Sequence, residues 1–179
     1  MKRILLAVVS VFLMSASVAF AQTTNVEPTK DLDAKYATNM LKPGTRAPEF
    51  KLKTYDAKEI KLSQYRGSYV VLDFWASWCG PCRAEMPNVV EAYKRFKDKG
   101  LEIIGISFDS KKLQWSAAVE KLGMTWPQMS DLKGWESSAA AVYGIRSIPS
   151  NILVDPQGKI VAMDLRENRL QEVLAEKLK

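Results

Sequence analysis

Two runs of mostly apolar residues predict the centre of a covered β-sheet. Residues 69–75 read Tyr-Val-Val-Leu-Asp-Phe-Trp, and residues 101–108 are similarly rich in Leu, Ile and Phe. A strand that is apolar on both faces is typical of a sheet with helices packed on each side. Asp73 is the one charged residue in the first run, so its carboxyl group is expected to be buried with its neighbours.

The segment between these runs has the periodicity of an amphipathic helix. Over residues 81–97 the apolar positions recur at spacings of three and four. A strand, a helix and a second strand in this order predict a β-α-β unit and an α/β fold. Further helices are predicted over residues 113–122, 135–143 and 167–178, and shorter strands over residues 50–53, 59–62, 151–154 and 159–164.

The start of the chain has the layout of a secretory signal peptide. Met1-Lys2-Arg3 carries positive charge, residues 4–14 are apolar, and Ala19-Phe20-Ala21 has the small residues of a cleavage site. We therefore predict a signal peptide over residues 1–21 and a periplasmic or otherwise extracytoplasmic location. The alternative is an uncleaved membrane anchor, because residues 4–21 approach the minimum length of a membrane-spanning helix.

The rest of the chain has room for one domain. Residues 22–42 are polar and unpatterned, so we expect a flexible leader there. The folded unit is predicted to begin at Pro43-Gly44 and to extend over residues 43–179, a length that can bury a sizeable core.

Charge and histidine content exclude several classes of function. The net charge is +6, and its basic residues are scattered, which argues against a nucleic-acid surface. The chain contains no histidine, so Ser-His and Cys-His catalytic pairs and histidine metal sites are excluded. A metal bound by two thiolates remains an alternative, although it would need further ligands from elsewhere.

The only two cysteines, Cys79 and Cys82, lie where the first apolar run meets the predicted helix. A disulfide between residues three apart closes a very small loop, so it stabilises the folded chain little. Thiols at the start of a helix are reactive instead, because the helix dipole stabilises a thiolate. We therefore predict a redox site, with Cys79 as the nucleophile and Cys82 as the resolving thiol.

Residues 73–82, Asp-Phe-Trp-Ala-Ser-Trp-Cys-Gly-Pro-Cys, resemble the active-site segment of thioredoxins, and Ile148-Pro149 resembles their cis-proline loop. The opening at residues 44–50, the helix start at 82–87 and the extra stretch at 109–146 resemble the exported TlpA/ResA-like branch of that family. The resemblance implies a thioredoxin fold, a three-layer α/β/α arrangement with a central mixed sheet. It also implies an added N-terminal β-hairpin and a helical insertion before the cis-proline loop.

The same resemblance implies roles for residues around the dithiol. It places Asp73 beneath Cys82, where a buried carboxyl would take up and return the proton of the resolving thiol. Glu85 matches a glutamate that influences the thiols in ResA-like proteins, although a solvated helix residue is the alternative. The lysine that thioredoxins carry near their buried aspartate is not evident here. The implied substrate groove is formed by Trp78, Gly80, Pro81, Ile148 and Pro149.

The remaining tryptophans are expected to pack in the protein interior. Trp75 lies inside a predicted core strand. Trp115, Trp126 and Trp135 lie in the inserted stretch, and we expect them to fill its core rather than to bind a ligand, because large aromatic side chains dominate burial.

The predicted activity is that of a thiol-disulfide oxidoreductase that reduces protein disulfides. Gly80-Pro81 resembles the dipeptide of reducing thioredoxins, and no cofactor is expected beyond the redox-active disulfide. Implied partners are disulfide-containing envelope proteins, with apocytochrome c as one candidate, and a thiol electron donor in the membrane. Two alternatives stay open, a thiol peroxidase and a non-catalytic copper carrier or adaptor that uses the dithiol and groove.

Overall fold

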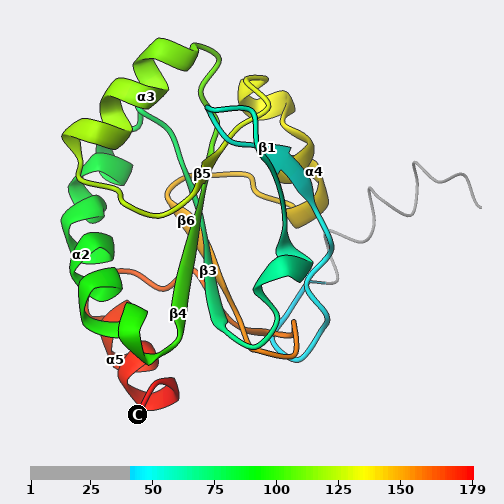
Figure 1. Cartoon of the computed structure of the whole chain (residues 1–179), viewed down its shortest axis with the longest axis vertical. Coiled ribbons are helices and arrows are strands. Elements are labelled where there is room, and N and C mark those ends of the chain that lie inside the picture. The colour runs from blue at the N-terminus through cyan, green and yellow to red at the C-terminus, as the bar shows by residue number, and fades with distance from the viewer. Residues whose placement is uncertain (1–40) are drawn as a thin grey trace, which may run out of the picture.

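The computed structural model describes residues 41–179, so the predicted signal peptide and almost all of the predicted leader lie outside the described residues. A five-stranded sheet with the strand order β5-β4-β3-β6-β7 forms its centre (Figure 1). No helix within the described part of the chain is long and apolar enough to cross a membrane. The strands are β3 (Tyr69–Trp75), β4 (Leu101–Ser107), β5 (Gln128–Met129), β6 (Ser150–Val154) and β7 (Ile160–Met163).

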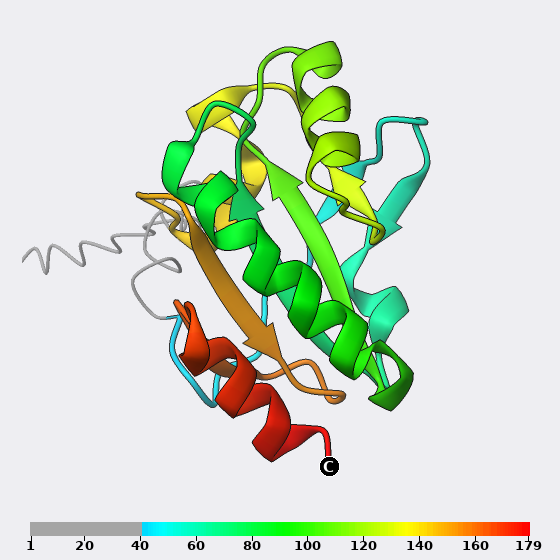
Figure 2. The ribbon, with the colours of Figure 1, turned by 90° about the vertical axis from the view of Figure 1, so that its left-hand side faces the viewer.

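The sheet is mixed, as predicted, because its two halves are connected differently. Strands β3, β4 and β5 are parallel, whereas β6 and β7 run antiparallel to their neighbours. Right-handed crossovers put α2 (Gly80–Phe96) and α3 (Lys112–Lys121) on one face of the sheet, where α5 (Asn168–Lys177) joins them (Figures 1 and 2). The short helix α4 (Ser138–Tyr143) covers the other face.

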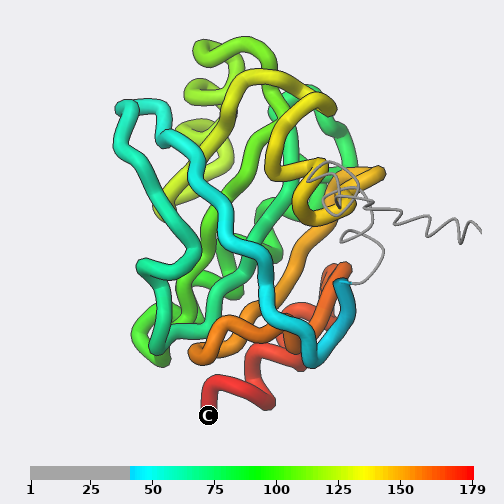
Figure 3. Tube along the Cα trace, turned by 90° about the vertical axis from the view of Figure 1, so that its right-hand side faces the viewer, coloured from blue at the N-terminus to red at the C-terminus, as the bar shows by residue number. Residues whose placement is uncertain are grey.

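Both edges of the sheet are covered by the segment that precedes β3. The predicted hairpin forms as β1 (Lys51–Lys53) and β2 (Glu59–Lys61), and Thr54 beyond β1 bridges to Met129 at one edge. At the opposite edge the Gly44 N–H donates to the Ile160 carbonyl at 2.8 Å. Figure 3 shows the chain crossing from one edge to the other before it enters β1. These contacts pair part of the backbone at each edge, which reduces its availability for pairing with other chains.

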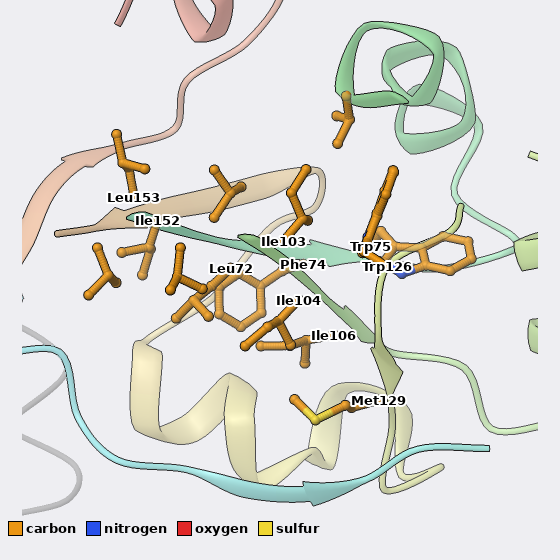
Figure 4. Packing of buried hydrophobic residues seen from close by; sticks show 14 of the residues in the cluster. Leu72, Phe74, Trp75, Ile103, Ile104, Ile106, Trp126, Met129, Ile152 and Leu153 are labelled. Atoms are coloured by element: carbon orange, nitrogen blue, oxygen red, sulfur yellow. The ribbon is translucent and has the colours of Figure 1, made fainter. Parts of the chain in front are cut away.

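The core explains why the central strands are apolar at successive positions. Side chains alternate along β3, so Leu72 and Phe74 lie on the α4 face while Trp75 lies on the opposite face (Figure 4). The rings of Phe74 and Tyr143 of α4 are 5.6 Å apart. Leu72, Phe74 and Trp75 are all completely buried, because helices or loops cover both faces.

Two elements of the inserted stretch differ from the prediction. The predicted helix over residues 135–143 is a 3₁₀ turn (Gly134–Glu136) followed by α4, because Ser137 caps α4 by accepting the Ala139 N–H at 3.3 Å. Strand β5 was not predicted, since two residues are too few to show a periodic pattern. The other predicted elements end within one residue of the observed bounds.

Candidate active site

The two cysteines lie at the carboxyl end of β3, where the chain turns into α2, and they form a disulfide. Cys79 is the N-cap residue of α2, and its Sγ accepts the backbone N–H of Cys82 at 3.1 Å. Pro81 fits the first turn of the helix because its nitrogen has no hydrogen to donate. Cys79 is 5% exposed and Cys82 is 1% exposed, so Cys79 is the more accessible residue of the pair.

The Ile148–Pro149 loop lies against this disulfide. The peptide bond between the two residues is cis, as predicted, and the Ile148 carbonyl oxygen is 3.8 Å from Cys79 Sγ. The guanidinium of Arg166 donates to the Pro149 carbonyl. The fold therefore joins parts of the predicted groove that are 69 residues apart in the chain.

An exposed pair of tryptophans flanks the dithiol. The rings of Trp78 and Trp135 are 6.4 Å apart, and the Trp135 ring meets Phe108 edge-on at 5.1 Å. Trp135 is 47% exposed, so the prediction that it packs in the core is wrong. The loop after β5 carries it to the surface beside Trp78, and no pattern in the sequence indicates that placement. The other predicted interior tryptophans, Trp75, Trp115 and Trp126, are buried.

Asp73 is buried on the α2 face of β3. It alternates with Phe74, which faces α4, and it is 4% exposed. Its Oδ2 has no hydrogen-bond partner among the described residues. Burial, and secondarily the negative charge of Glu85, raises the pKa of Asp73 to about 7. Near neutral pH the carboxyl can therefore both hold and release a proton.

Glu85 is half-buried and serves as an anchor between elements, so the solvated alternative describes it poorly. Its Oε1 accepts the Asn88 side-chain amide at 2.7 Å and the Glu167 N–H at 2.8 Å. These bonds tie α2 to the turn that precedes α5. Glu85 is thereby held where its charge acts on Asp73.

The position opposite Asp73 on β4 is Gly105, so this strand offers no lysine there. A side chain at Gly105 would collide with the side-chain amide of Gln128. That amide accepts the indole N–H of Trp75 at 3.0 Å. A neutral, buried amide thus fills the space beside Gly105.

A second buried aspartate, Asp109, was not predicted as part of the site. It is 1% exposed, and its carboxylate accepts the Ser77 N–H at 2.9 Å, the Ser77 hydroxyl at 2.6 Å and the Ser107 hydroxyl at 2.7 Å. These bonds hold the turn that leads into Cys79. The two polar residues Ser107 and Asp109 at the end of a buried apolar strand are the signal from which it was detectable.

No group of three or more Cys, Asp or Glu side chains within residues 41–179 is placed to hold a metal ion. The geometry instead provides a dithiol at a helix start, a cis-proline loop against it and a buried carboxyl on the same face of the sheet. This arrangement can exchange disulfides.

Comparisons with known proteins agree with this chemistry. The AhpC/TSA family matches residues 43–163. The thiol-disulfide oxidoreductase ResA of Bacillus thuringiensis subsp. konkukian is 34% identical over 136 residues, which cover 76% of each protein. ResA of Bacillus anthracis is 29% identical over 171 residues, covering 96% of this chain and 92% of that protein. The solved thioredoxin domain of a thiol-disulfide oxidoreductase from Bacteroides vulgatus superposes with a TM-score of 0.73 at 34% identity, covering 78% of this chain and 99% of that one.

Proposed function

The chain belongs to the AhpC/TSA family and is a thiol-disulfide oxidoreductase of the thioredoxin-like kind, and we propose that it reduces disulfide bonds in proteins outside the cytoplasm. The observation that carries the proposal is the Cys79–Cys82 pair at the start of α2, in contact with the cis Ile148–Pro149 loop. The exported location rests on the signal-like layout of residues 1–21.

In this proposal the reduced form begins the reaction at Cys79. Its thiolate attacks one sulfur of the partner's disulfide, that bond breaks, and the other partner sulfur leaves as a thiolate. The Cys82 N–H, which donates to Cys79 Sγ at 3.1 Å, and the positive end of α2 stabilise the attacking thiolate. The product of this step is a mixed disulfide between Cys79 and the partner.

The second step belongs to Cys82 and Asp73. The Cys82 thiol gives its proton to the Asp73 carboxylate and attacks Cys79 Sγ, the bond between Cys79 and the partner breaks, and the second partner sulfur leaves as a thiolate. Two electrons have then moved to the partner, and the protein is left with the Cys79–Cys82 disulfide seen in the structure. A carboxyl whose pKa lies near 7 suits this exchange because it accepts and returns a proton at physiological pH.

The reducing direction is supported by the residues between the cysteines. A protein of this kind is strongly oxidising when its thiolate is stabilised, because the reduced form is then favoured. Gly80 and Pro81 carry no charge, so they add nothing to that stabilisation.

Sustained reduction outside the cytoplasm requires a supply of electrons, for which we propose a thiol donor in the membrane. Disulfide-containing envelope proteins are the proposed substrates, with apocytochrome c as one candidate. The dithiol needs no further cofactor.

Trapping with Cys82→Ser tests the assignment of roles. Without a resolving thiol, Cys79 should stay covalently linked to its partners, and reducible adducts should accumulate in envelope extracts. Cys79→Ser is the matched control, because it leaves one thiol but removes the nucleophile. Equal adducts from both variants, or none from either, would contradict the assigned roles.

The reduction potential tests the direction. We expect a value closer to that of thioredoxin, roughly −270 mV, than to that of the strong oxidant DsbA, roughly −120 mV. Insulin-disulfide reduction should proceed, whereas peroxide consumption should be slow. Rapid peroxide turnover would favour the thiol peroxidase alternative, and stable binding of one copper ion without insulin reduction would favour the carrier.

A further inference from the structure

A pocket of about 520 Å³ opens directly beside the redox segment, between the start of α2 and the exposed side of α3. Ser77 and Trp78, the two residues before Cys79, form part of its wall, and Arg83 follows Cys82. The α3 side contributes Gln114, Ala117, Ala118 and Lys121. We call it the α2–α3 pocket. Its volume is within the range of sites that take a small molecule or a few side chains.

The charge of the α2–α3 pocket has one sign. Arg83 and Lys121 are the charged residues of its lining, and neither forms an ion pair within residues 41–179. Both side chains are exposed. The pocket is therefore complementary to an anionic group, and no carboxylate of its own lining competes for the cations.

Arg83, the cation that the α2 side contributes to the pocket, is fixed in position. Arg83 Nη1 donates to the Ser77 carbonyl at 2.7 Å, and Ser77 is itself held by Asp109 through two hydrogen bonds. The guanidinium has further N–H groups beyond the one used for Ser77. A preorganised cation at this place loses less conformational entropy on binding than a free one.

The apolar part of the lining suits the stem of a side chain. Trp78 is 51% exposed and forms one wall, while Ala117 and Ala118 are small and leave room between α2 and α3. A glutamate has both parts that this lining would recognise, methylene groups for Trp78 and a carboxylate for Arg83 and Lys121. A bare inorganic anion would leave the apolar wall unused.

We propose that the α2–α3 pocket is a specificity subsite that takes an acidic side chain of the disulfide-bearing partner. The proposal rests on the proposed reduction of protein disulfides. A partner whose sulfur reaches Cys79 must lie close to Trp78, so residues near the partner's cysteine lie within reach of the pocket. Partners with Glu or Asp near the cysteine are then preferred over partners with Lys or Arg.

Synthetic peptides test the preference. Three otherwise identical peptides with an internal disulfide carry Glu, Gln or Lys two residues before the first cysteine. A second set of three carries the same residues two positions after the last cysteine. The reduced protein should react with the better-placed Glu peptide roughly fivefold faster in kcat/KM than with its Lys counterpart at low salt, an effect typical of an exposed ion pair. The difference should fade at about 0.5 M salt.

Charge reversal separates this subsite from a general effect of net charge. Lys121→Glu leaves one cation, Arg83, and one carboxylate in the lining, so it should remove most of the preference for the Glu peptide. Lys112→Glu is the matched control, because it makes the same change on the same helix but lines a different pocket, beside Lys53 and Lys133. It should leave the preference unchanged.

Each outcome is informative. Equal rates for the Glu and Lys peptides of both sets, or the same shift from Lys112→Glu as from Lys121→Glu, would overturn the subsite while leaving the reductase activity intact. Failure of the reduced protein to react with any of the peptides or with insulin would instead contradict the proposed function, and the subsite with it. Thermal unfolding of both variants checks that each is folded.

Discussion

Two aspartates of this protein are buried to a similar degree, yet their surroundings are opposite. Asp73 in β3 is 4% exposed and has an oxygen without a partner among the described residues. Asp109, just after β4, is 1% exposed and accepts three hydrogen bonds from Ser77 and Ser107. Burial alone therefore does not decide the role of a carboxyl group. The hydrogen-bond donors around it set the free-energy cost of burying it and its affinity for a proton.

Asp73 is suited to proton transfer, whereas Asp109 is suited to holding the structure in place. The donors around Asp109 compensate its burial and fix the turn into Cys79, so it acts by positioning. The unpartnered oxygen of Asp73 costs stability when ionised, a cost that proteins accept chiefly where a proton must move. Four predictions, from three substitutions, test this contrast.

The largest expected effect is on the pH dependence of stability. Burial raises the pKa of Asp73 from 3.8 to about 7, so the folded state holds a proton that the unfolded state loses. The contribution of that proton to the free energy of unfolding has its full value below about pH 4 and is lost as the pH rises through 7. For Asp73→Asn, the free energy of unfolding relative to the parent should therefore increase by up to about 4 kcal/mol between about pH 4 and pH 8. Urea unfolding at each pH measures it, and a constant difference would mean that Asp73 is ionised normally.

Asp109→Ala should destabilise the protein by about 3 kcal/mol, because three donors around Ser77 and Ser107 lose their partner. Urea unfolding at about pH 7 measures the loss. Ser77→Ala is the control and should lose less, since the backbone N–H bond to Asp109 remains. A loss no larger than that of Ser77→Ala would contradict the anchoring role of Asp109.

Asp73→Asn should also slow the resolving step by roughly 10- to 100-fold near pH 7, because the amide cannot accept the Cys82 proton. Stopped-flow decay of the mixed disulfide measures this step separately from the attack by Cys79. The attack itself should change little. An unchanged decay rate would remove Asp73 from the proposed mechanism.

The smallest expected effect comes from Glu85→Gln. Its charge is the lesser of the two causes that raise the pKa of Asp73, and glutamine can still accept the Glu167 N–H. The pH profile of the resolving step should therefore move to lower pH by less than about one unit. Glu91→Gln on the same helix is the control, and a shift of equal size there would point to a general charge effect.

Much of the site was detectable in the sequence because its signals are local. The apolar run with one aspartate, the cysteine pair and the periodic segment after it lie within residues 69–97. Family resemblance added the Ile148–Pro149 loop, which the structure places 3.8 Å from Cys79 Sγ. Trp135 was misjudged because an aromatic residue has the same sequence signal in a core and on a surface. Asp109 was missed because Ser77, which donates two of its three hydrogen bonds, lies 32 residues earlier in the chain.

By itself, the sequence determined the order of the helices and strands other than β5, and the position of the dithiol at a helix start, since both follow from side-chain periodicity and from neighbours within a turn or two. Only the tertiary structure decided which groups surround the dithiol. The Ser77–Asp109, Cys79–Ile148 and Glu85–Glu167 contacts join residues 32, 69 and 82 positions apart. Such contacts depend on how strands order and helices pack, which local patterns do not specify. The same packing gives one buried aspartate three donors, whereas an oxygen of the other has none within residues 41–179.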